Sequence, residues 1–115
     1  MLALESIEGR ADDVLTFPAV ADAARAVEVL PDFIRRAVMF ASPEIEEYWV
    51  RQPAPGELIV SLKASDPARP EAEARVREEL DRLSERLGFA RPGLTFSREL
   101  PAPGLRKLRR VERVR

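Results

Sequence analysis

The residues of this chain whose types and spacing could do chemistry lie near its two ends. Near the amino terminus, Gly9-Arg10-Ala11-Asp12-Asp13 places two adjacent carboxylates after a glycine and an arginine. Adjacent carboxylates can bind Mg²⁺ through their oxygens, and a solvated polar turn is the simpler interpretation of the same residues. Near the carboxyl terminus, Lys107 lies among five arginines within residues 104–115. A cluster of this kind can form an anion site for phosphate or carboxylate.

The charge of the chain is unevenly distributed. Residues 104–115 carry a net charge of +5, whereas residues 1–103 carry −6. A solvated basic end, for example the last turns of a helix, accounts for the cluster as well as an anion site does. A nucleic-acid arm is the third interpretation, but residues 104–115 include no aromatic side chain to stack on a base. The acidic body would also repel a polyanion, so no nucleic-acid partner is expected.

Composition limits the chemistry further. The 115 residues are 45% hydrophobic and 34% charged, which indicates one globular domain spanning residues 1–115. The chain contains no cysteine and no histidine, which excludes disulfides, thiolate nucleophiles, Cys-based zinc sites and Ser-His or Cys-His catalysis. No apolar run is long enough for a membrane helix, and the first residues do not resemble a secretory signal. A cytoplasmic location and no membrane partner are therefore expected.

The elements that must position these residues follow from hydrophobic periodicity. We expect a small α+β domain with an antiparallel sheet packed on two helices. Its sheet begins with an N-terminal strand-turn-strand, and its chain ends in a basic tail or helix. Proline and glycine mark the helix ends, at Pro31 and Ser42-Pro43 for the first helix and at Gly88 for the second. The expected elements are strands at 2–7, 14–17, 27–30, 45–51, 57–63 and 94–98, helices at 31–42 and 70–87, and a loosely ordered tail at 104–115.

The best hairpin and the clearest helix predict the core. Residues 57–63 alternate apolar and polar, as in a half-buried strand, and residues 70–87 carry a leucine stripe at helical spacing. The expected core residues are Leu58, Val60, Leu62, Val76, Leu80, Leu83, Leu94 and Phe96.

Three segments in this order resemble the C-terminal domain of adenylate-forming enzymes, the acyl-CoA synthetase and ligase superfamily, most closely its phenylacetate–CoA ligase branch. Residues 7–15, Ile-Glu-Gly-Arg-Ala-Asp-Asp-Val-Leu, are similar to the family's Gly-Arg-x-Asp-Asp segment. Residues 29–31 and 42–45 resemble its proline-bounded helix. The third segment resembles the family's pattern Leu-Pro-Arg-Thr-x-x-Gly-Lys-x-x-Arg. Aligned from Leu100-Pro101 without a gap, Lys107 falls on its lysine and Arg110 on its arginine, whereas Ala102-Pro103 replaces Arg-Thr and Arg106 replaces the glycine.

The resemblance implies a mobile lid. Such enzymes join a carboxylic acid to AMP and pass the acyl group to a thiol such as coenzyme A. Lys107 would be the catalytic lysine of the first step, Asp12 and Asp13 would form the hinge within segment 1–13, and Arg10 and Arg110 would contact nucleotide or phosphate. ATP with Mg²⁺ would be bound mainly by the N-terminal adenylation domain of the full-length protein, which is the expected partner together with the carboxylic acid substrate.

Two further expectations concern the chain alone. It contains no Ser/Thr/Gly-rich phosphate loop, so we expect the isolated chain to be inactive and to bind ATP weakly. The acceptor is coenzyme A, a carrier protein or an amine. The alternative to a lid is a stand-alone α+β binding or regulatory module that oligomerises through its sheet.

Overall fold

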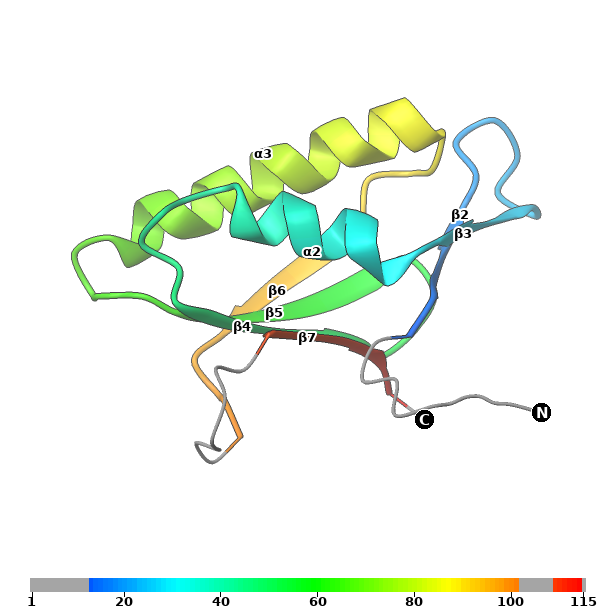
Figure 1. Cartoon of the computed structure of the whole chain (residues 1–115). Coiled ribbons are helices and arrows are strands. Elements are labelled where there is room, and N and C mark those ends of the chain that lie inside the picture. Colours follow the sequence, from blue (N-terminus) through cyan, green and yellow to red (C-terminus); the bar gives the residue numbers. More distant parts are fainter. Residues whose placement is uncertain (1–12, 102–108, 115) are drawn as a thin grey trace.

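The computed structural model describes residues 13–101 and 109–114 and confirms the α+β class (Figure 1). The predicted strand at residues 2–7 lies outside the described residues. Most element boundaries agree with the sequence pattern to within two residues, because proline and glycine mark them in the chain. The elements are β2 (Leu15–Pro18), β3 (Ala26–Val29), α2 (Pro31–Met39), β4 (Glu47–Gln52), β5 (Glu57–Lys63), α3 (Arg69–Leu87), β6 (Gly93–Ser97) and β7 (Arg109–Arg113).

The strands form two sheets. Strands β2 and β3 pair antiparallel, and a four-stranded sheet has the order β6-β5-β4-β7. Antiparallel pairing is confirmed for the β4–β5 hairpin, whereas β6 pairs parallel to β5 and β7 parallel to β4. Helix α3 makes the crossover between β5 and β6, as a parallel pair requires. Each outer strand of the sheet therefore runs in the direction of its inner neighbour.

Both helices begin at or next to the predicted start signal, and α3 also ends at its predicted stop signal. Pro31 is the first residue of α2, and Asp32 lies in its first turn, where a carboxylate complements the helix dipole. Gly88 follows α3 with φ of 82°, in the left-handed region that glycine adopts at little cost. Helix α2 ends at Met39, two or three residues earlier than expected, and Phe40 caps it.

The core lies between the helices and one face of the four-stranded sheet, and both helices cover that face (Figure 1). Alternation along β4 and β5 points every second residue into this layer. The prediction of burial is confirmed for Leu58, Val60, Leu62, Val76, Leu80 and Leu83. Leu94 and Phe96 are only partly buried, because among the described strands β6 has a neighbour on one side alone.

The expectation for the C-terminal segment is wrong where the structure describes it. Residues 109–113 form a strand, not a loose tail or a helix. Its central residue, Val111, is fully buried and lies opposite Val50 of β4. The arginine side chains beside Val111 reach solvent, which weakens the repulsion among them. Burial of Val111 in the core then offsets the repulsion that remains.

Two hydrogen bonds of a buried glutamine side chain join the β2–β3 hairpin to the four-stranded sheet. The Thr16 backbone N–H donates to Gln52 Oε1 at 2.8 Å, and Gln52 Nε2 donates to the Thr16 carbonyl at 2.9 Å. The amide side chain of Gln52 thus replaces a strand neighbour at the end of β4. Stacking of Phe17 on Phe89, with ring centroids 4.4 Å apart, joins the same hairpin to the end of α3.

Tyr48, the only tyrosine of the chain, allows a direct test of this packing. Burial raises the pKa of its phenol above the ordinary value of 10.0, and the guanidinium of Arg35 opposes that shift only in part. We expect the phenolate absorbance of the folded protein to rise with a midpoint above 10.0, and that of the denatured protein to rise near 10.0.

The same shift has a consequence for stability. The folded state favours the neutral phenol, so this contribution is fully present below the unfolded pKa and is lost as pH rises through the folded pKa. As the pH rises from the unfolded to the folded pKa of Tyr48, the free energy of unfolding measured in denaturant should fall more steeply for wild type than for Tyr48→Phe. The burial of this hydroxyl would be contradicted if the free energy of unfolding depended equally on pH in the two proteins. A midpoint of the phenolate absorbance at or below 10.0 in the folded protein would contradict it as well.

Candidate functional site

Strand β7 carries the part of the predicted site that the structure describes. It begins at Arg109, two residues after Lys107 in the sequence, and contains Arg110. Parallel pairing places Arg109 opposite Tyr48 and Arg113 opposite Gln52, so β7 pairs with all of β4 except its first residue. Arg110 lies opposite Trp49, is exposed, and belongs to the face of the sheet that the helices leave uncovered.

Asp13 is bound to the carboxyl-terminal half of β7. Its backbone N–H donates to the Val111 carbonyl at 2.9 Å, and its carboxylate accepts the Arg113 N–H at 2.9 Å. A carboxylate that accepts a backbone N–H at the edge of a sheet provides the acceptor that a further strand would otherwise supply. Two segments a hundred residues apart, the second aspartate of the Asp-Asp pair and the C-terminal strand, are therefore joined directly.

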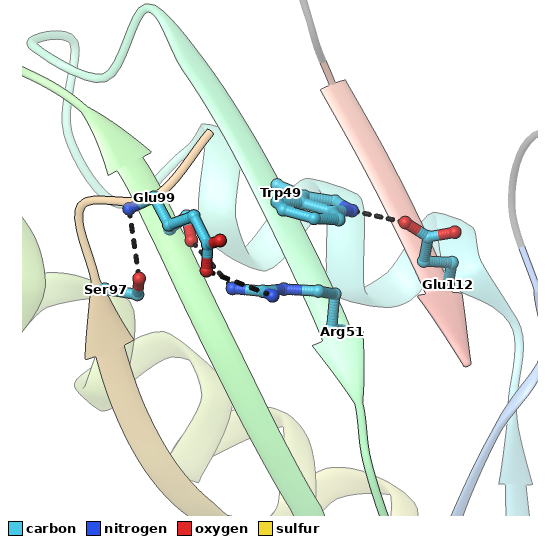
Figure 2. Close-up of polar contacts among 6 residues, drawn as sticks. Trp49, Arg51, Ser97, Glu99 and Glu112 are labelled. Atoms are coloured by element: carbon cyan, nitrogen blue, oxygen red, sulfur yellow. Dashed lines mark hydrogen bonds and ion pairs between the residues drawn. The ribbon is translucent and has the colours of Figure 1, made fainter. Parts of the chain in front are cut away.

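The uncovered face of the sheet holds a polar network centred on Trp49 (Figure 2). The guanidinium of Arg51 stacks 3.9 Å from the indole centroid, and the indole N–H donates to the carboxylate of Glu112 on β7. Alternation along β4 places Trp49 and Arg51 on the same face, two residues apart. The contact with Glu112 links β4 to β7 through side chains as well as through the backbone.

Arg51 continues this network toward the opposite edge of the sheet. It donates to the hydroxyl of Ser61 at 3.3 Å and lies 3.6 Å from the carboxylate of Glu99. The backbone N–H of Glu99 donates to the hydroxyl of Ser97 at 3.0 Å, which orders the chain after β6 (Figure 2). The Arg51 side chain is largely buried but the Glu99 side chain is 73% exposed, so solvent still screens this ion pair.

The other predicted site residues have the following positions. Arg10, Asp12 and Lys107 lie outside the described residues. Asp13 and Arg110 are brought to the same strand, Asp13 at its end and Arg110 on its exposed face. The sequence analysis missed Trp49, Arg51 and Glu112. Alternation in residues 47–52 places the first two on one face, but nothing local connects them to Glu112, which lies 63 residues from Trp49.

Within residues 13–101 and 109–114, no three acidic side chains gather closely enough to hold a metal ion. In the same part of the chain, neither helix has the length and apolar character needed to cross a membrane. Comparison of the chain with protein-family models, curated proteins and solved structures finds no significant match to any of them.

Proposed function

We propose that this chain is the mobile C-terminal domain of an adenylate-forming ligase, which activates a carboxylic acid with ATP and passes the acyl group to a thiol such as coenzyme A. The observation that carries the proposal is the arrangement along β7. Asp13 is bound at one end of this strand, and the other end begins at Arg109, two residues after Lys107 in the sequence.

This arrangement suits a lid that works in two orientations. The four residue steps from Arg109 to Arg113 separate the two ends by about 13 Å. The β2–β3 hairpin lies at the Asp13 end, because Thr16 is bound to Gln52, which pairs with Arg113. A rotation about a hinge at Asp12 would bring either the Lys107 end or the hairpin end to the adenylation domain.

The chemistry of each end fits one step of the reaction. Adenylation crowds negative charge around the α-phosphate and the attacking carboxylate, where a lysine provides a compact positive charge. Arg110 is exposed on the strand that follows Lys107 and would contact a phosphate group in that orientation, with Arg10 as the second such contact. ATP and Mg²⁺ are held mainly by the adenylation domain in this scheme, and the hairpin end shapes the path of the thiol.

The test is ATP–pyrophosphate exchange by the full-length protein over a panel of carboxylic acids. We expect exchange that depends on one acid or a narrow group of acids, and none by the isolated chain. The reading frame before Leu2 should encode several hundred residues with a phosphate loop. Sub-micromolar ATP binding by the isolated chain, or a folded full-length protein without exchange on any acid, would overturn the proposal.

A stand-alone module that oligomerises through its sheet is the second candidate, and strand β6 favours it. In the part of the chain that the structure describes, β6 pairs with β5 alone and leaves its outer edge open to another strand. Sedimentation equilibrium separates the two candidates. The lid predicts a monomer, whereas the module predicts a dimer that Thr95→Lys, an added charge in the middle of β6, disrupts.

A further inference from the structure

Helices α2 and α3 form a groove on their outer side that the lid function does not use. It is lined by Phe33, Arg36, Ala37, Phe40, Glu79, Arg82, Leu83 and Arg86 and has a volume of about 270 Å³. Ala37 and Leu83 are buried and form its floor, whereas Phe40 at one end is 77% exposed. A large aromatic side chain this exposed beside a hollow marks a surface that a partner can cover.

The two walls of the groove have the same spacing. The wall along α2 has residues at positions 33, 36 and 37 and at 40, the cap of the helix, and the wall along α3 has residues at 79, 82, 83 and 86. Each set follows the i, i+3, i+4, i+7 pattern of one helical stripe. The groove is therefore about two turns, or roughly 10 Å, long, and its walls are two packed helices. A third helix placed between α2 and α3 would contact ridges of side chains on both walls of the groove.

The charge of the groove is positive. Three arginines line it against one acid, Glu79, which forms an ion pair with Arg82 at 2.7 Å. Arg36 and Arg86 form no ion pair with an acidic side chain of the described residues, although the whole chain carries a net charge of −1. Two exposed phenylalanines therefore lie beside two arginines without an acidic partner among the described residues. This surface is complementary to a ligand with apolar side chains along one stripe and acidic side chains next to that stripe.

We propose that this groove binds an acidic amphipathic helix of a partner protein. Apolar side chains of that helix enter between Phe33 and Phe40, and its carboxylates meet Arg36 and Arg86. A second copy of this chain fits less well, because a symmetric contact would set the same arginines against each other. The proposal does not depend on the ligase function, since none of these residues belongs to the Asp13 or Lys107 ends.

The probe is a labelled synthetic peptide of about four helical turns, with leucine along one stripe and glutamate elsewhere, titrated with the chain in fluorescence anisotropy. We expect a Kd between about 1 and about 100 μM that weakens with added salt. The same peptide with lysine in place of glutamate should bind at least about tenfold more weakly. Phe40→Ala and Arg86→Glu should each weaken binding of the glutamate peptide by at least about tenfold.

Matched controls separate the groove from general surface effects. Val20 is 72% exposed and lies away from the groove, and Arg25 is an exposed arginine outside it, so Val20→Ala and Arg25→Glu should bind as wild type. Circular dichroism verifies that each variant is folded. The proposal is overturned by equal binding of the two peptides, or by unchanged binding in the groove variants. It is also overturned by no binding at about 1 mM, by dimerisation that Phe40→Ala abolishes, or by displacement of the peptide with equimolar inorganic phosphate.

Discussion

In the proposed full-length ligase, replacement of Lys107 by alanine is expected to slow adenylation by about 10²–10³-fold and to leave thiol transfer close to the wild-type rate. The reason is that the lysine would meet the α-phosphate and the carboxylate in only one of the two orientations. After rotation about Asp12 its charge would lie away from the reaction. Pyrophosphate exchange measures the first step, and a chemically supplied acyl-adenylate with the thiol measures the second.

Arg106→Ala is the matched control for this prediction. Arg106 is the neighbouring cation in the sequence, so it tests whether the position or merely the charge matters. A large loss of adenylation in Arg106→Ala with none in Lys107→Ala would place the catalytic cation one residue earlier. Equal losses in both half-reactions for Lys107→Ala would assign the lysine a structural role.

Leu80→Ala is expected to destabilise the isolated chain by about 2–5 kcal/mol. Leu80 is fully buried in the middle of α3, where the helix packs on the four-stranded sheet. Its truncation removes apolar contact and leaves a cavity that close-packed neighbours fill only in part. For a domain of this size, the loss would be a large fraction of the total free energy of unfolding, which is typically about 5–15 kcal/mol. Unfolding in urea, followed by circular dichroism, measures it.

Leu30→Ala provides the control for Leu80→Ala. Leu30 precedes α2 and is more than half exposed, so its truncation removes little buried surface. We expect a change within about 0.5 kcal/mol, as for other surface substitutions. Similar losses in the two variants would mean that the buried face of α3 is not the one the structure shows.

The candidate site was less predictable than the fold. The Asp-Asp pair and the basic cluster are recognisable in the sequence, but their joining through Asp13 and Arg113 is not. A hydrogen bond between residues a hundred positions apart leaves no periodic signal in either segment. For the same reason, the sequence does not predict the contact between Trp49 and Glu112 or the groove between α2 and α3.

The sequence by itself determined the elements whose signals are local. Alternation in residues 57–63 and the glycine turn before them specify the β4–β5 hairpin, and the leucine stripe ended by Gly88 specifies α3. Only the tertiary structure decided the partners of the outer strands, because parallel pairing joins segments with no local turn between them. It also decided that basic residues 109–113 form a strand. A single valine among arginines has no pattern of its own, and it becomes core only where Val50 and the helices surround it.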